Sequence, residues 1–249
     1  MNLQDALDYL EDGYGIFIGD SFYANTDYLV QDLIEQKEKA EQLLHIQSKQ
    51  MNRCSKVVTG TIFGKRYSVL GMGFFDALIQ FDILLETNPI QVGIKLGKGG
   101  EMSFALPPSA VKQVSDLSRE QINNLLLAFI QLHLTPLFHA VSRLAGSKTD
   151  HMFSQVSHNL HQTALRLRSK LPDQEQKIDA YLNALVSDPL FGEAGENPLQ
   201  GEFRLYQPPN GSSPFYIRKH CCLAYVIHGA DKSFCCATCP LIPDEERVS

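Results

Sequence analysis

The chain has 249 residues, of which 44% are hydrophobic and 20% are charged, and its formal net charge is -6. This length and composition allow a sizeable buried core and exclude an intrinsically disordered chain. Because the balance is acidic and no long basic run is present, the sequence predicts no nucleic-acid partner.

The N-terminal sequence MNLQDALDYLEDGYG is acidic and has no apolar segment of the kind found in a secretory signal. The two most apolar stretches, VLGMGFFDALI and LLLAFIQLHLTPLF, are interrupted by Asp76 and by Gln131 and His133. We therefore expect no membrane span, with peripheral membrane association left open, and a cytoplasmic location. In that reducing compartment, clustered cysteines bind metal or do redox chemistry more often than they form structural disulfides.

The first third of the chain mixes helix and strand signals. Asn25 or Thr26 is placed to cap a helix over residues 28–49, whose apolar side chains fall on one face. Residues 56–63, KVVTGTIF, are rich in β-branched side chains and alternate, which predicts a strand. Residues 65–85 are apolar nearly all round, and their length favours a buried helix.

A β-hairpin is predicted after these elements. The segments QVGIKL and EMSFAL flank the glycine-rich turn GKGG, residues 97–100. This turn lacks the glycine spacing of a phosphate-binding loop and the Lys-Ser/Thr helix start that follows one, so the hairpin interpretation is favoured.

The second half of the chain begins with helices. Ser118 and Gln121 form a capping box, and the helix that they begin carries an apolar stripe that Pro136 must kink or break. Two more helices are predicted, over residues 149–171 and 173–186.

The region after Asp188 is dense in glycine and proline as far as Phe215. A long stretch of this composition is usually a working loop or a wrap around another part of the molecule. The tetrapeptides FRLY and FYIR are short strand candidates at its end.

These elements together predict an α+β fold with a mixed α/β N-terminal portion, a helical middle and an irregular C-terminal segment. We place a boundary after residue 112. Residues 1–112 then form a mixed α/β lobe, and residues 113–249 form a helical lobe that carries the C-terminal segment.

Cysteines are concentrated in the last thirty residues, where Cys236-Ala-Thr-Cys239 precedes Pro240. A two-residue gap lets both sulfurs face one metal. The adjacent pair Cys221-Cys222 suits a single tetrahedral ion less well because neighbouring side chains diverge. A two-iron cluster presents ligand positions at both of its ends. On the residues alone, an iron–sulfur cluster, a zinc site and a dithiol pair all stay open.

The segment RKHCCLAYVIHGADKSFCCATCPLI resembles the C-terminal signature of the FhuF-type ferric siderophore reductases. The shared features are a basic residue, a Cys-Cys pair, a short aromatic-bearing segment and Cys-x-x-Cys-Pro, and the order of elements upstream is similar in outline. The resemblance implies a [2Fe-2S] cluster held by Cys221, Cys222, Cys236 and Cys239. It also implies one-electron reduction of a ferric siderophore, with the hydroxamate class as the candidate substrate, and release of Fe(II).

The spacer between Cys222 and Cys236 departs from the family pattern because it is longer. A longer surface loop costs little, but it leaves the third ligand open between Cys235 and Cys236. We favour Cys236 because it keeps the two-residue turn with Cys239. The isolated Cys54 is interpreted as a bystander.

Electrons must come from an external donor protein or reductant, because no nicotinamide- or flavin-binding motif is visible. Arg218 and Lys219, with His220, precede the first cysteine and are the candidate substrate-binding cations; a solvated basic turn is the alternative. Three further cations on one predicted helix are expected to be ordinary surface charges: Arg166, Arg168 and Lys170.

Other polar residues are weaker candidates. His158 and His161 share a helix face, but no third metal ligand accompanies them. His133 and His139 are expected to be hydrogen-bonded core residues.

Two other functions remain open. In one, the four motif cysteines bind zinc and fasten the tail of a binding or structural protein. In the other, the chain is an iron–sulfur electron carrier with no siderophore site.

Overall fold

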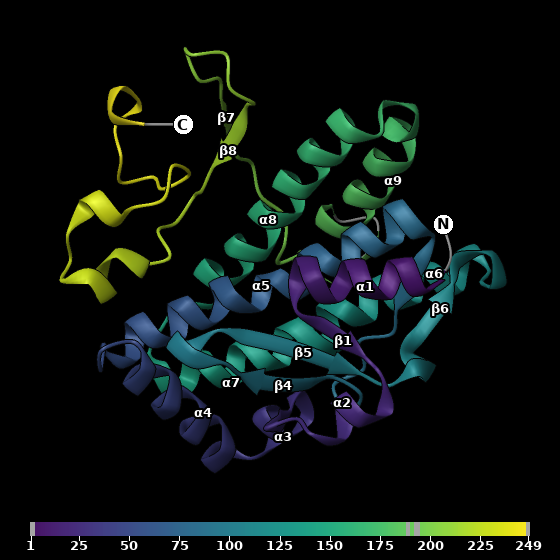
Figure 1. The fold of residues 1–249 in the computed structure, drawn as a ribbon, viewed down its shortest axis with the longest axis horizontal. Coiled ribbons are helices and arrows are strands. Elements are labelled where there is room, and N and C mark those ends of the chain that lie inside the picture. Colours follow the sequence, from purple (N-terminus) through teal and green to yellow (C-terminus); the bar gives the residue numbers. More distant parts are fainter. Residues whose placement is uncertain (1–2, 188–189, 192–194, 248–249) are drawn as a thin grey trace.

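The computed structural model describes residues 3–187, 190–191 and 195–247, and its fold is α+β, as predicted (Figure 1). The helices are α1 (Leu3–Tyr14), α2 (Asp20–Ala24), α3 (Val30–Glu35), α4 (Lys37–Gln50), α5 (Lys56–Phe81), α6 (Arg119–Ala128), α7 (Thr135–Ala145), α8 (Thr149–Lys170) and α9 (Glu175–Val186). The strands are β1 (Ile16–Ile18), β2 (Tyr28–Leu29), β3 (Ile83–Leu85), β4 (Gly93–Leu96), β5 (Met102–Leu106), β6 (Val111–Gln113), β7 (Arg204–Tyr206) and β8 (Phe215–Ile217).

The larger sheet has the strand order β1-β5-β4-β2. Strands β4 and β5 are antiparallel, with Leu96 opposite Met102, so the predicted hairpin around residues 97–100 is confirmed. Strand β1 is parallel to β5, and β2 is antiparallel to β4. Strands β3 and β6 form a second antiparallel pair, and β7 and β8 form a third, which confirms the two strand candidates near the C-terminus.

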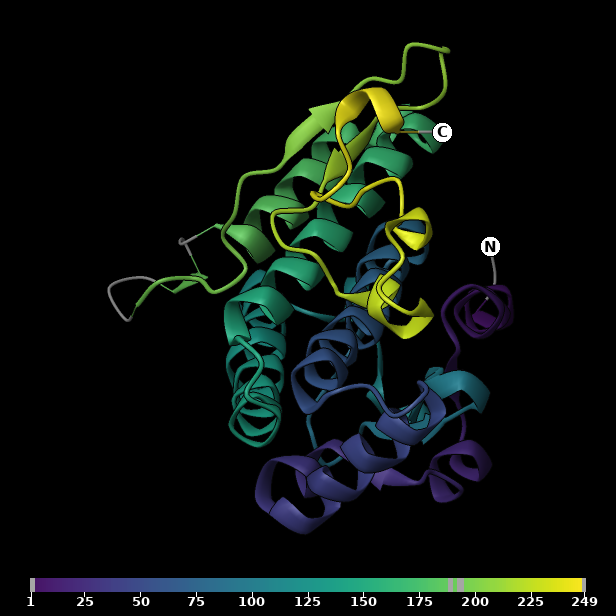
Figure 2. The same cartoon turned by 90° about the vertical axis from the view of Figure 1, so that its left-hand side faces the viewer.

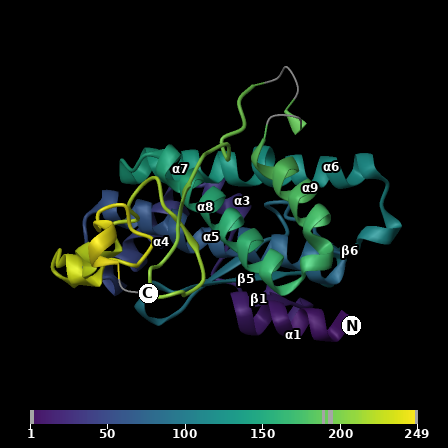
Figure 3. The same cartoon turned by 90° about the horizontal axis from the view of Figure 1, so that it is seen from above.

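Helix α5 is the centre of the fold, because most of its residues are buried. It packs along α8, with α1 on one side and α7 on the other, and the view from above shows α6 and α7 along the edge opposite α1 (Figure 3). Buried residues on both sides of residue 112 belong to one contiguous hydrophobic core. The continuous core gives no sign of a division at residue 112, and the predicted boundary there stays a prediction.

The predicted strand over residues 56–63 is wrong, because these residues form the first two turns of α5. Ser55 caps the helix by accepting a hydrogen bond from the Val58 N–H (3.3 Å). A Cβ at Gly64 would lie 2.7 Å from the Cβ of Met152, so glycine here allows α5 to approach α8 closely. Burial in this close helix packing outweighs the strand preference of the β-branched side chains.

The single helix predicted over residues 28–49 is also wrong, because it is divided into β2, α3 and α4. Neither Asn25 nor Thr26 caps it, because β2 pairs with β4 before the helix begins. Extended backbone at Gln36 then separates α3 from α4. Pairing with the sheet therefore decides the structure here against the helical periodicity of the sequence.

The predictions for the helical middle are confirmed. Ser118 and Gln121 form both hydrogen bonds of the capping box. A π-helical segment, Phe129–Leu134, separates α6 from α7 just before Pro136, which lacks the N–H that a continuous α-helix would use. Helices α8 and α9 follow close to their predicted bounds.

The combined helical segment 119–145 is, among the described residues, the one helix long and apolar enough to cross a membrane by length and composition. Half of its most apolar window is buried in this structure, and Phe129, Ile130 and Phe138 belong to the main core. Core packing therefore accounts for the apolar composition, and the absence of a membrane span stays a prediction.

The two histidines of this segment differ. His133 is fully buried, its Nδ1 donates to the Thr87 carbonyl (2.5 Å), and its Nε2 accepts from the Tyr67 hydroxyl. Burial lowers the pKa of His133 to about 4, so the ring is neutral near pH 7. The expectation of a hydrogen-bonded core residue is confirmed for His133 and wrong for His139, which is exposed.

A buried carboxylate fixes α1 and α8 to α5. Asp76 is fully buried, accepts hydrogen bonds from the Tyr9 (2.8 Å) and Tyr14 hydroxyls, and pairs with Arg166 (2.5 Å). Arg166 therefore has a structural role that its interpretation as a surface charge missed. Arg168 instead pairs with the half-exposed Asp179 on α9 (2.6 Å).

We predict that Arg166→Met lowers the free energy of unfolding by about 2 kcal/mol, because it leaves a buried carboxylate without its cation while Arg166 itself is partly exposed. The matched control Arg168→Met breaks a more exposed ion pair and should cost less than about 1 kcal/mol. Urea unfolding followed by circular dichroism measures both. Equal losses for the two variants would contradict the assigned role of Asp76.

Candidate metal centre

The C-terminal segment, residues 204–247, lies beside α8 and α5 and outside the main core (Figure 2). Strand β8 packs on α8, and a turn over residues 224–228 contacts α5. The buried apolar and cysteine side chains of this segment are few: Pro208, Ile217, Cys222 and Cys239. The segment therefore depends on polar contacts, or on a ligand, to hold its shape.

Three side chains on one face of α8 hold the backbone of residues 216–220. Gln155 donates to the His220 carbonyl (3.0 Å), His158 donates to the Tyr216 carbonyl (2.8 Å), and Gln162 accepts from the Tyr216 N–H (2.9 Å). Because these bonds go to the main chain, they fix the approach of the segment to the first cysteine pair.

The pair His158 and His161 has structural contacts of its own. Burial lowers the pKa of His158 to about 4, and its Nε2 is committed to Tyr216. His161 donates from Nδ1 to the Ser157 carbonyl (2.8 Å). Hydrogen bonding thus accounts for both rings without a metal.

A small hydrophobic cluster anchors the turn that follows the first cysteine pair. Leu223, Val226 and Ile227 pack on buried side chains at the junction of α4 and α5. Cys54 packs against the same cluster, and its Sγ lies 3.3 Å from the Thr59 hydroxyl. Cys54 is therefore a packing residue.

The four favoured cysteines come together as two pairs of sulfurs. Cys221 Sγ lies 3.6 Å from Cys239 Sγ. Cys222 Sγ and Cys236 Sγ share one neighbour, the Nη1 atom of Arg218, at 3.4 and 3.3 Å. Each pair joins one residue of the Cys-Cys dipeptide to one residue of the Cys-x-x-Cys turn, so the two motifs face each other.

The thiols interact with one another both within these pairs and between them, because Cys222 hydrogen-bonds with both Cys236 and Cys221. A hydrogen bond with Cys222, together with burial, raises the pKa of Cys236 to about 12. A hydrogen bond from Cys222 lowers the pKa of Cys221, and burial raises that of Cys239. A metal bound here would displace these protons, because the ligating form of cysteine is the thiolate.

Cys235 lies next to one of the four favoured cysteines. Its thiol neighbours Cys239, where it adds to the effect of burial in raising the pKa of Cys239. Cys236 hydrogen-bonds with Cys222, and the Arg218 guanidinium lies against both sulfurs. Each of the two thiols thus neighbours one favoured ligand, and the choice of Cys236 as the third ligand stays a prediction.

The described part of the chain contains no group of three or more His, Cys, Asp or Glu side chains gathered closely enough to hold a metal ion. A single tetrahedral ion needs four sulfurs around one point. A two-iron cluster instead needs two cysteine ligands at each of its irons.

The two candidate substrate-binding cations face different surroundings. Arg218 is directed at the sulfurs of Cys222 and Cys236. Lys219 is exposed and lines a polar cavity beside α8, together with His220. The sequence placed these cations together beside the cysteines but could not assign one to the sulfurs and the other to the cavity.

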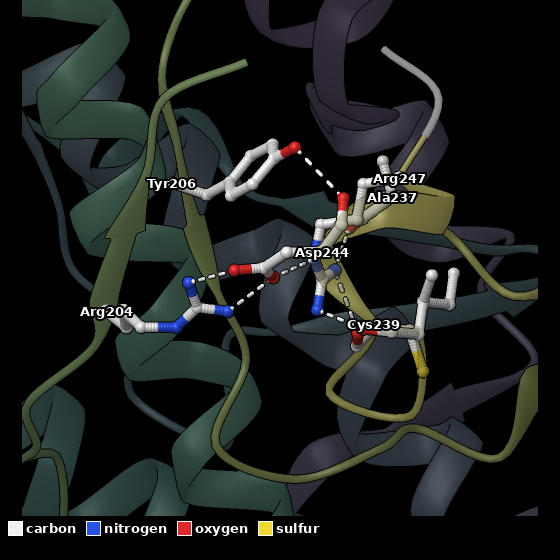
Figure 4. A network of polar contacts seen from close by, with 7 residues as sticks. Arg204, Tyr206, Ala237, Cys239, Asp244 and Arg247 are labelled. Carbon is white, nitrogen blue, oxygen red and sulfur yellow. Dashed lines mark hydrogen bonds and ion pairs between the residues drawn. The ribbon is translucent and has the colours of Figure 1, made fainter. Parts of the chain in front are cut away.

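A second guanidinium, that of Arg247, holds the Cys-x-x-Cys turn (Figure 4). Arg247 is buried and donates to the carbonyls of Ala237 (2.5 Å), Cys239 (3.0 Å) and Ile242 (2.6 Å). Its Nε also donates to Asp244 (2.9 Å). One side chain thus satisfies three carbonyls of a turn that has no regular secondary structure.

We call Arg247 and its three carbonyl contacts the Arg247 clasp, and Asp244 links this clasp to β7. Arg204 makes two hydrogen bonds of 2.7 Å to the Asp244 carboxylate, and the Tyr206 hydroxyl donates to its carbonyl (3.1 Å). Arg204 and Arg247 hold the pKa of Asp244 well below its usual range. Sequence reasoning missed this clasp because its signal, one arginine and one aspartate among the last residues, is common on protein surfaces.

Comparison with protein-family models and with characterised proteins finds no match to this chain.

We predict that Arg247→Met loosens the turn, because the three carbonyls lose a buried donor that contributes about 1 kcal/mol to each. Amide hydrogen exchange in residues 236–243 should accelerate about tenfold or more, with little change in α5. Arg204→Met is the control and should have a smaller effect, because Arg204 contacts the carboxylate and not the turn. Equal protection of the turn in wild type and Arg247→Met would contradict the clasp.

Proposed function

We propose that this protein is a ferric siderophore reductase that holds a [2Fe-2S] cluster on Cys221, Cys222, Cys236 and Cys239. The observation that carries the proposal is the meeting of the two cysteine motifs as two sulfur pairs, with the Arg218 guanidinium against one pair. The resemblance of the motif to the FhuF-type reductases supports the same assignment.

The donor set fits such a cluster. All four donors are cysteine sulfurs, which are the ligands of biological two-iron clusters. Cys222 and Cys239 are buried, whereas Cys221 and Cys236 are partly exposed. The centre would therefore be held from the protein side and stay open to an electron acceptor on the other side.

Arg218 supports electron storage at this position. Its guanidinium lies against two sulfurs, where a fixed positive charge favours the more negative, reduced state of a metal–thiolate centre. Arg218 is thus a positioning and charge-balancing residue, and the substrate contact falls to Lys219.

When bound, the cluster supplies one electron at a time to ferric iron. Ferric iron in a siderophore is held by hard oxygen donors, and the lower charge of Fe(II) weakens that hold. The reaction needs no nucleophile or proton-abstracting base in the protein. The chain's part is to hold the chelate near the cysteines and to receive electrons from an external donor protein or reductant in the cytoplasm.

The first test is the metal content and colour of the protein prepared without oxygen. We expect two irons and two sulfides per chain, visible absorption that bleaches on reduction, and a paramagnetic signal from the reduced protein. Cys239→Ser should remove most of the iron, whereas Cys235→Ser and the packing control Cys54→Ser should keep most of it.

Zinc at one equivalent per chain, or no metal, would defeat the cluster and favour a zinc-fastened binding protein. Loss of colour in Cys235→Ser together with its survival in Cys236→Ser would overturn the choice of the third ligand.

The second test separates a reductase from a simple electron carrier. Protein reduced in advance is mixed with a ferric hydroxamate chelate, and its reoxidation is followed by absorption while an Fe(II) indicator records release. We expect oxidation by the chelate to be about tenfold faster than by an unrelated acceptor of similar potential. Equal rates for both acceptors would favour the carrier.

A further inference from the structure

A polar cavity lies beside α8, and one edge of it adjoins the cysteine segment. Its volume is about 630 Å³, within the range of sites that hold organic ligands. The walls come from the start of α8, from residues 196–203 and from Lys219 and His220. Figure 3 shows the chain before β7 passing α8 on its way to the cysteine segment.

The loop wall of the cavity is fixed in place. Asn197 is buried and donates to the carbonyls of Leu185 (2.9 Å) and Ser187 (2.8 Å), and the Leu199 side chain is fully buried. At the other end, the Phe203 ring packs edge-on against the rings of His158 and His161. The cavity is therefore held by contacts at both ends of its loop wall.

The floor of the cavity carries polar groups that the protein leaves without a partner. Within the described residues, the hydroxyl oxygens of Ser154 and Ser157 are buried and make no hydrogen bond, and both residues line the cavity. Ser157 is 1% exposed. An unpaired buried hydroxyl costs free energy, and native proteins keep few of them without a reason such as a bound ligand or water.

The cavity also lies next to the candidate metal centre. His220 lines it and directly precedes Cys221. The His220 ring stacks on His151 with centroids 4.2 Å apart, and Gln155 holds its carbonyl. A molecule in the cavity would thus lie one residue away from the first cysteine, against a residue whose ring is stacked on His151 and whose carbonyl is bound by Gln155.

The charges on the walls indicate what the cavity accepts. Lys219 is the cation among its lining Lys, Arg, Asp and Glu side chains, and Asp150 and Glu196 are the anions. This balance disfavours a ligand with several negative charges, whereas the hydroxyl and lysine donors suit a ligand rich in neutral or weakly charged oxygen atoms.

We propose that this cavity binds an oxygen-donor metal chelate of low net charge, with Ser157 and Lys219 as its polar contacts and His220 between it and Cys221. The assignment rests on the proposed function for the identity of the metal, ferric iron. It adds the place of binding and a preference against polyanionic chelates.

A second cavity of about 760 Å³ lies further along α8 and is lined by Arg166, Arg168 and Lys170. Each of these cations already has a partner: Asp76, Asp179 and Gln80 respectively. This cavity serves as the control, because it is of similar size but is not lined by Lys219 or His220.

Binding can be measured without electron transfer by using gallium(III), which is not reduced under these conditions. The probe is the gallium complex of a trihydroxamate, titrated into the protein as isolated and followed by calorimetry.

Ser157→Ala should weaken binding about fivefold, with the thermal stability unchanged or raised, because the hydroxyl has no partner in the protein. Gly201→Leu should weaken it at least about tenfold, because a Cβ there meets Phe203 and Ser157 at ordinary contact distances and a larger side chain fills the cavity.

The control Ser213→Leu narrows the second cavity and should leave binding unchanged. A gallium tris-catecholate, which is strongly anionic, should bind at least about tenfold more weakly than the trihydroxamate complex; equal affinity would overturn the charge preference. If Ser157→Ala and Gly201→Leu bind the trihydroxamate like wild type, or if Ser213→Leu is the variant that loses it, the cavity is wrongly assigned even where ferric chelate is still reduced. If the gallium chelate binds as predicted but the ferric chelate is not reduced, the cavity assignment stands and the proposed reductase function is wrong.

Discussion

The hydrogen bonds from one face of α8 to the backbone of residues 216–220 are the contacts on which the candidate site depends. The segment that follows buries few apolar side chains, and its hydrophobic cluster holds residues 223–227 and not the entry to the Cys-Cys pair. Gln155, His158 and Gln162 do so instead, by fixing main-chain groups at the entry to the Cys-Cys pair. Helix α8 is itself packed along the buried helix α5 in the main core. The position of the cysteines is therefore fixed, through α8, by the most buried part of the molecule.

The two cations that precede the cysteines face different surroundings because consecutive side chains of an extended chain point to opposite sides. Just after β8, Arg218 faces the sulfurs of Cys222 and Cys236, and Lys219 lines the cavity beside α8. A substrate bound to Lys219 would thus leave Arg218 in place. Under the proposed function, the arrangement would separate the cation beside the sulfurs from the cation that meets the chelate.

Local signals predicted the elements that local chemistry decides. The capping box at Ser118, the hairpin around residues 97–100 and the helix α8 all follow from nearby side chains. The strand predicted over residues 56–63 failed because glycine-mediated packing against α8, which is remote in sequence, decides that segment. Likewise the cysteine spacing indicated a metal centre, but the direction of Arg218 and the clasp of Arg247 depend on contacts that no spacing contains.

The segment that carries the cysteines is held at three places, and each uses a different physical interaction. Polar side chains of α8 fix its entry, a small hydrophobic cluster fixes residues 223–227, and the Arg247 clasp fixes the Cys-x-x-Cys turn. None of these three contacts lies between the two sulfur pairs. A metal centre bound there would hold the segment at a fourth place. Metal binding and folding are coupled when the ligands lie on an irregular segment. If the proposed cluster is bound here, its removal should therefore loosen residues 218–240 and leave the main core intact. The cavity wall at Lys219 and His220 belongs to that loosened stretch, so chelate binding and metal occupancy would be coupled through the backbone that joins His220 to Cys221.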